Sequence, residues 1–249
     1  MRFYMPSKSV CFITALLLPG LVVAEDPNQP EMPAMHSPIF WGVQFEEFEF
    51  RLDEDSNTLG VWNADAFVGT DEFKVRWLSN GEYADQDNAF ETLENHLVGQ
   101  IPVSTFFDAK VGVRFDTAEG PDRTYALIGL VGLAPYWFEL DTNVYVSDEG
   151  DFSADFDAEY ELLFTNRLIL TTSLDVDIAF SEDSEIGLGK GLSKTELGFR
   201  LRYDLIDRSF SPYIGVVQEQ RWGDTADLIR NKGGKTHDLL AVIGAKLMF

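Results

Sequence analysis

The sequence feature that most constrains the fold is a strict two-residue alternation from residue 152 to residue 164. Every even-numbered position in this segment is apolar. The odd-numbered positions between them include four carboxylates: Asp155, Asp157, Glu159 and Glu161. Successive side chains of a β-strand point to opposite faces, so the segment predicts a strand with one apolar and one acidic face. A pairing slip by one residue would move all four acids onto the apolar face, which means that the register is firmly specified.

The same alternation returns along the chain, most clearly at residues 107–116, 168–180 and 196–204. A tilted strand of about 9–11 residues is long enough to cross a bilayer, and these segments reach that length. The pattern predicts about twelve strands. They are expected near residues 40–50, 58–68, 73–82, 89–101, 106–116, 123–132, 136–146, 152–164, 168–180, 194–204, 212–222 and 236–249.

The connections between these strands alternate between short turns and longer loops. Turns are expected near residues 69–71, 102, 132–135, 165–166 and, somewhat longer, 205–211. Loops are expected at residues 51–57, 83–88, 117–122, 147–150, 181–193 and 223–235. Short turns on one side and long loops on the other are typical of outer-membrane barrels. The sequence therefore predicts an all-β protein, a closed antiparallel transmembrane β-barrel of about twelve strands.

Aromatic residues fall near the expected strand ends, where outer-membrane barrels carry interfacial belts. They include Trp41, Trp62, Trp77, Trp222, Tyr136, Trp137, Phe138 and Tyr145. A soluble barrel or sandwich would also alternate, but with its polar face outward and its apolar face inside. Alternation alone does not separate the two, so the location depends on the termini.

The N-terminal residues 1–24 are predicted to be a signal peptide, with Arg2 and Lys8 before a largely apolar run and Ala24 at a small-residue cleavage site. A membrane-anchor helix is the alternative, but the run is short and contains Pro19 and Gly20. Residues 25–38 are Pro-rich and are predicted to be a flexible periplasmic leader. Residues 39–249 are then expected to form the barrel.

The last strand alternates and stops on Phe249. Such an ending is similar to the assembly signal of bacterial outer-membrane barrels, although an ordinary amphipathic strand would share the alternation. Together with the signal peptide it predicts a barrel surrounded by the lipid of the Gram-negative outer membrane. Because the strand number is even, both termini are expected in the periplasm.

Charge and residue content exclude several function classes. The chain has 42 acidic and 19 basic residues and a formal charge of −23, which becomes −25 without residues 1–24. So acidic a protein is not expected to bind nucleic acid. The one cysteine, Cys11, lies in the predicted signal peptide, so the mature chain has no thiolate site. The only barrel histidines, His96 and His237, lie in no nucleophile motif, and we expect no enzymatic activity.

Several motifs occur in the order found in one known family. They are GLAPYWFE at 132–139, EYELL at 159–163, TNRLIL at 165–170, GLS at 191–193, ELGFRLRY at 196–203, SPYIGV at 211–216 and GDTA at 223–226. The chain from about residue 40 onward resembles the copper resistance protein B family, the outer-membrane component of bacterial copper-resistance systems. The resemblance implies a protein that binds copper at the outer membrane or lets it out of the periplasm, with a periplasmic copper-binding protein as a partner. A general diffusion pore or a structural barrel is the alternative.

The first candidate copper site precedes the barrel. Members of the family often carry a Met- and His-rich segment there, but this chain retains only Met32, Met35 and His36. Thioether and imidazole groups suit copper ions. These three residues could surround one ion, or they could be a chance cluster in a linker, and the reduced segment argues against strong copper storage.

The second candidate site is the acidic face itself. Asp155, Asp157, Glu159 and Glu161 would lie about 7 Å apart along the strand. Neighbouring strands would add Glu139, Asp141, Asp175 and Asp177, answered in part by Arg200, Arg202, Lys110, Arg114, Lys74 and Arg76. Such a wall could be a path of many weak cation sites, or a charge network that fills a narrow barrel. Carboxylates are hard ligands and would discriminate copper poorly.

Two further features belong to the expected lumen. His96 is expected to point inward beside Glu94, where it could be a ligand or simply structural, and His237 is expected at the extracellular rim. The adjacent pair Glu46 and Glu47 breaks the alternation of the first strand, which calls for a bulge or a position at the rim.

Overall fold

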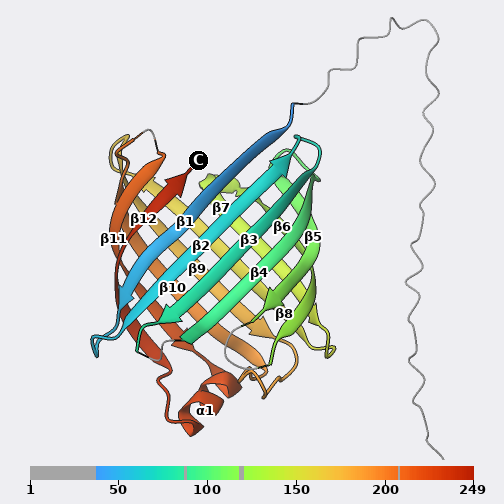
Figure 1. Cartoon of the computed structure of the whole chain (residues 1–249), viewed down its shortest axis with the longest axis vertical. Coiled ribbons are helices and arrows are strands. Elements are labelled where there is room, and N and C mark those ends of the chain that lie inside the picture. The colour runs from blue at the N-terminus through green and yellow to red at the C-terminus, as the bar shows by residue number, and fades with distance from the viewer. Residues whose placement is uncertain (1–37, 87–88, 118–120, 207) are drawn as a thin grey trace, which may run out of the picture. The chain divides into compact units, whose positions relative to one another are not determined.

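The computed structural model describes residues 38–86, 89–117, 121–206 and 208–249. Each strand pairs antiparallel with its sequence neighbours, and the first pairs with the last, so twelve strands close a barrel (Figure 1). The strands are β1 (Phe40–Leu52), β2 (Thr58–Gly69), β3 (Lys74–Ala84), β4 (Ala89–Pro102), β5 (Phe107–Asp116), β6 (Arg123–Ala134), β7 (Phe138–Ser147), β8 (Phe152–Leu163), β9 (Leu168–Ala179), β10 (Gly191–Tyr203), β11 (Phe210–Arg221) and β12 (His237–Met248). The predicted fold class is confirmed, and the predicted strands are all present with ends shifted by a few residues.

The apolar face of the sheet points outward. Large apolar residues on separate strands are more than half exposed, among them Phe50, Ile128 and Ile243. The acidic face of β8 points inward and lines the lumen. A soluble barrel would show the opposite arrangement, so the orientation decides the question that alternation alone leaves open. An apolar exterior around a polar interior is the arrangement of an outer-membrane barrel.

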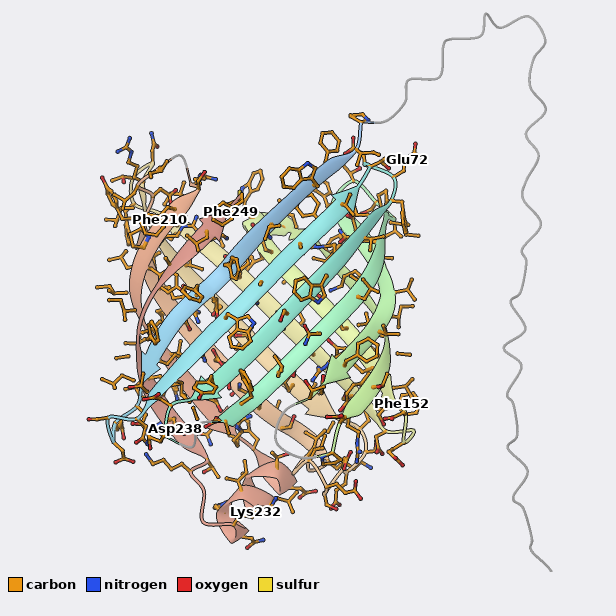
Figure 2. All side chains as sticks on the ribbon, viewed as in Figure 1. Glu72, Phe152, Phe210, Lys232, Asp238 and Phe249 are labelled. Atoms are coloured by element: carbon orange, nitrogen blue, oxygen red, sulfur yellow. The ribbon has the colours of Figure 1, made fainter. Side chains whose placement is uncertain are left out.

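The two ends of the barrel differ. Phe249 returns beside the beginning of β1, where Val43 and Phe249 exchange two backbone hydrogen bonds of 3.2 and 2.9 Å. Glu72 and Phe210 lie at this same end, whereas Phe152, Lys232 and Asp238 lie at the other (Figure 2). We call them the turn end and the loop end, since the short turns gather at the first and the long loops at the second (Figure 1).

A bulge in β1 resolves the broken alternation. The pairing of β1 with β2 shifts between Phe45 and Glu47, and its pairing with β12 shifts between Phe45 and Glu49. The extra residue allows Glu46 and Glu47 both to line the lumen. The bulge that the adjacent glutamates call for is therefore present.

The turn between β6 and β7 differs from the prediction. A short 3₁₀ segment, η1 (Pro135–Trp137), precedes β7, so Tyr136 and Trp137 lie in the turn rather than in the strand. Both have a left-handed backbone, with φ of 68° and 67°. Their side chains are exposed at the turn end, where amphipathic rings suit the membrane–water boundary.

The loop end is covered by structure that the alternation does not predict. A helix, α1 (Gly223–Asn231), forms within the last loop and contacts β10. The Thr225 hydroxyl accepts a hydrogen bond of 2.9 Å from the backbone N–H of Gly189, which joins α1 to the loop between β9 and β10. No helix among the described residues has the length and apolar character needed to span a membrane.

The predictions for the N-terminal region concern residues outside the described ones. These are the signal peptide at 1–24, most of the leader at 25–38, and the ligands Met32, Met35 and His36. They remain predictions.

Candidate cation pathway in the barrel lumen

The lumen contains a cavity of about 1230 Å³ that is lined by residues of all twelve strands. Its lining runs from Phe106 and Leu133 at the turn end to Ile186 and Lys232 at the loop end. Carboxylates outnumber basic side chains among the lining residues. The cavity is therefore polar and predominantly acidic rather than a packed apolar core.

One side of the lumen, formed by β7, β8 and β9, is an acidic wall. These three strands contain no lysine, arginine or histidine. The wall consists of Glu139, Asp141, Asp155, Asp157, Glu159, Glu161, Asp175 and Asp177. Asp157 lies directly opposite Asp141 on one side and Asp175 on the other. Like charges directly opposite each other destabilise a sheet, so this arrangement has a cost that ordinary packing would avoid.

Only part of the acidic wall has a counter-charge. Lys110 reaches Asp141 at 2.5 Å, and Arg202 reaches Glu161 at 2.7 Å. Asp155 accepts hydrogen bonds from Tyr145 and from the Asn143 side chain. These contacts engage Asp141, Asp155 and Glu161 and leave the other carboxylates less compensated. We call Asp157, Glu159, Asp175 and Asp177 the middle of the wall.

The middle of the wall has no ion pair within the described part of the chain. Asp157, Glu159, Asp175 and Asp177 have no basic side-chain nitrogen within 4.0 Å there. Asp157 and Asp175 lie directly opposite each other on β8 and β9. Carboxylates on opposed cross-strand positions repel each other, so the middle of the wall favours a positive species in the lumen.

The opposite side of the lumen is an ion-paired hub centred on Glu49. Its side chain is fully buried and accepts hydrogen bonds from Arg200 at 3.0 Å, Arg51 at 2.7 Å and Tyr213 at 2.8 Å. Arg200 also contacts Glu47 at 2.7 Å, and Arg51 contacts Glu196 at 2.9 Å. A buried carboxylate surrounded in this way is structural, because each of its lone pairs is engaged.

Gly244 allows the hub to form. A Cβ atom at this position would lie 2.6 Å from the Cβ of Glu49 and 2.8 Å from the ring of Tyr213. Contacts that short do not occur between real side chains, so position 244 admits only glycine while Glu49 and Tyr213 stay in place.

The sequence prediction for the six basic residues is only partly correct. Lys110 and Arg202 do answer the acidic wall. The other four pair elsewhere: Arg200 with Glu47 and Glu49, Arg114 with Glu94 and Asp116, Arg76 with Asp65, and Lys74 with Asp108. These four basic side chains form ion pairs with carboxylates outside β7, β8 and β9. The wall is therefore more negative than the sequence suggests.

His96 lies where the sequence places it. It lines the lumen beside Glu94, with its Nε2 atom 3.7 Å from Glu94 Oε2. The ring packs edge-on against Tyr145 at a centroid distance of 6.2 Å. His237, in contrast, is exposed at the beginning of β12, at the loop end.

The described residues contain no group of three or more His, Cys, Asp or Glu side chains arranged to hold a metal ion. The predicted ligands Asp155, Asp157, Glu159 and Glu161 share one face of β8, but they are not gathered around a point. Metal binding by these residues, and by Glu94 and His96, therefore stays a prediction. The geometry offers a series of separated oxygen donors, which suits weak and transient cation contacts.

A latch at the loop end escaped sequence reasoning. Arg123, at the beginning of β6, binds Asp183 at 3.0 Å and Glu185 at 2.7 Å in the loop between β9 and β10. Burial raises the pKa of the Asp183 carboxyl. The hydrogen bond and charge of Arg123 and the N–H of Glu185 lower this pKa by more than burial raises it, so it lies below its usual value. Ile186 and Leu188 of this loop line the cavity, so the latch holds a segment over the lumen.

The family model and the similar curated proteins point to the same family. The family model described as copper resistance protein B precursor matches residues 39–249. Copper resistance protein B of Escherichia coli is 36% identical over 217 residues, covering 87% of this chain and 72% of that protein. A copper resistance protein B homolog of Pseudomonas syringae pv. tomato is 30% identical over 204 residues, covering 82% and 68%. Among solved structures, the NanC porin has a TM-score of 0.52 at 12% identity, covering 84% of this chain and 99% of that one, which is a likeness of fold.

Proposed function

The chain belongs to the copper resistance protein B family, and from this premise we propose that its barrel lets copper ions cross the outer membrane through the acidic lumen. The observation that carries the proposal is the acidic wall of β7, β8 and β9, whose middle lacks a counter-charge within 4.0 Å among the described residues. Such a wall attracts cations without holding them tightly, as passage requires. The flux then follows the copper gradient.

The orientation and the flanking segments are part of the same proposal. We place the turn end and the C-terminus in the periplasm and the loop end outside, since long loops of such barrels are extracellular. In this orientation the leader at 25–38, with Met32, Met35 and His36, would collect copper from a periplasmic copper-binding protein. The family and the barrel resemble non-enzymatic outer-membrane proteins, and the absence of catalysis remains a prediction.

The rival function is a general diffusion pore. The size of the lumen cavity supports it, because a cavity lined by residues from both ends of the barrel offers room for small solutes. The two functions differ in what they require of the wall. A copper pathway depends on the carboxylates, whereas a general pore depends on its width.

Copper entry into vesicles tests the proposal. The full barrel is reconstituted into liposomes that contain a copper-responsive dye, and the initial rate is compared with protein-free liposomes. The wall variant Asp157→Asn/Asp177→Asn removes two lumen charges, and the control Asp148→Asn/Glu149→Gln removes two exposed charges from the loop between β7 and β8. We expect the wild type and the control to pass copper and the wall variant to pass it more slowly. Equal rates for all three, with equal passage of a neutral sugar, would favour the general pore.

A further inference from the structure

The donor atoms of the lumen select between the two oxidation states of copper. No methionine or cysteine is among the residues that line the described cavity, which offers oxygen and nitrogen donors only. Thioether and thiolate sulfur are the donors that favour Cu(I), whereas carboxylate and imidazole donors favour Cu(II) and other divalent ions. The lining therefore favours Cu(II) over Cu(I).

His96 is the one imidazole that lines the described cavity. The residue is 8% exposed, and its Nε2 atom is buried without a hydrogen-bond partner. Buried polar atoms are normally hydrogen-bonded, because leaving one unsatisfied costs about 1–3 kcal/mol. An unsatisfied nitrogen in a cation-attracting lumen has the chemistry of a metal ligand.

Glu94 supplies the second donor. One of its oxygens, Oε1, accepts a hydrogen bond from Arg114, and the other, Oε2, lies 3.7 Å from His96 Nε2. This separation is too long for a hydrogen bond. A divalent ion such as Zn²⁺ takes imidazole nitrogen at about 2.0 Å and carboxylate oxygen at about 2.1 Å. One ion of this size can therefore contact both atoms with a bent arrangement.

We propose that His96 Nε2 and Glu94 Oε2 form a two-donor station for Cu(II) inside the lumen, which deepens the proposed function and rests on it. The imidazole supplies discrimination that the carboxylates lack, since a nitrogen donor strengthens the natural preference for Cu(II) over other divalent ions. Two protein donors, with water completing the coordination, make a weak site. Arg114 weakens it further by its charge, although Glu94 and Asp116 both pair with this guanidinium. A weak site releases its ion, as a pathway requires.

Pulsed electron paramagnetic resonance of bound Cu(II) tests the station. The chain has three histidines, so the background protein carries Met32→Ala, Met35→Ala and His36→Ala and a histidine-free affinity tag, which leaves His96 and His237. Folding is checked by the heat-dependent migration of the barrel on a gel. We expect imidazole ¹⁴N couplings in the background protein, their loss in His96→Gln and in a second variant, His96→Leu, and their retention in His237→Gln. Couplings that survive both His96 variants, or that disappear with His237→Gln, would overturn the station.

Two further measurements complete the test. Under anaerobic reducing conditions, we expect the background protein to retain no more Cu(I) than His96→Gln against a competing Cu(I) chelator, and retention at His96 would overturn the preference for Cu(II). Copper entry into vesicles separates the station from the proposed function. A wild type that binds Cu(II) at His96 but passes none refutes the passage and leaves the site, whereas passage without a His96 nitrogen signal refutes the station and leaves the passage.

Discussion

Asp157→Asn should make the barrel more stable and less selective for cations. Asp157 faces Asp141 and Asp175 directly across two strand pairs. A charged cross-strand pair changes stability by about 0.2–1 kcal/mol, with like charges unfavourable. Removing the charge relieves two such pairs, so the free energy of unfolding should rise by about 0.4–2 kcal/mol. Asparagine keeps the size of the side chain, and its amide can donate a hydrogen bond to a neighbouring carboxylate.

The matched control is Glu161→Gln, the same chemical change on the same face of β8. Glu161 pairs with Arg202 at 2.7 Å, so its neutralisation removes an attraction instead of a repulsion. We expect a loss of about 1.5–3 kcal/mol, the range for hydrogen bonds to charged groups. Urea unfolding in lipid vesicles, followed by tryptophan fluorescence, gives both values, and reversal potentials in planar bilayers give the cation preference. If Asp157→Asn destabilises the barrel as Glu161→Gln does, Asp157 is not an uncompensated charge and the account of the wall is wrong.

Three other outcomes follow from the structure. Glu49→Gln should lower the free energy of unfolding in the same urea assay by about 2–4 kcal/mol, because it leaves the guanidinium of Arg200 partly uncompensated in a buried site. A loss no larger than that of an exposed loop substitution would contradict the structural role of the ion-paired hub. Arg123→Gln should lower the hydrogen-exchange protection of residues 181–190 at neutral pH, and unchanged protection would mean that the latch does not hold the loop. Because the pKa of Asp183 is lowered in the folded state, the stability that its carboxylate adds to the latch is fully present above the ordinary carboxyl pKa of about 4 and is lost as the pH falls through the folded pKa. Acidification should therefore lower the hydrogen-exchange protection of the wild-type loop, corrected for intrinsic exchange, toward that of Arg123→Gln. The protection of Arg123→Gln should not fall further.

The barrel could be predicted from the sequence because the membrane restricts the choices. Every backbone group must be paired within the bilayer, so alternating segments of this length can only close on themselves. The membrane also determines which face of each strand is apolar and points to the lipid. The bulge in β1 could be predicted because Glu46 and Glu47 are adjacent in the sequence. The helix α1 could not be predicted in this way, since it begins after Trp222 without a side-chain cap and is only nine residues long. It is held by contacts such as that between Thr225 and Gly189, which no local pattern contains.

The pairing of lumen charges could not be read from the sequence either. Strand order tells which residues are neighbours on the sheet, but contacts across the lumen depend on barrel width and strand stagger. Arg200 and Glu49 are 151 positions apart and lie on β10 and β1, which are not adjacent strands. From the sequence alone, Arg200 is expected to pair with the acids of β8 and β9. The wall is partly neutralised as predicted, by Lys110 and Arg202, but for this reason the prediction was wrong for Arg200, which pairs with Glu47 and Glu49.

The division of the lumen into two sides argues for a function in the wall. If the carboxylates served only to fill a narrow barrel, each should have a basic partner, as Glu49 has on the opposite side. Basic residues of suitable length are present in the lumen, yet none projects from β7, β8 or β9. The sheet therefore carries opposed carboxylates such as Asp157 and Asp175 at a cost in stability. A mobile cation offsets the repulsion between these carboxylates while it lies beside the wall, and the repulsion returns when the cation leaves. Such reversible, weak occupancy distinguishes a pathway from a storage site.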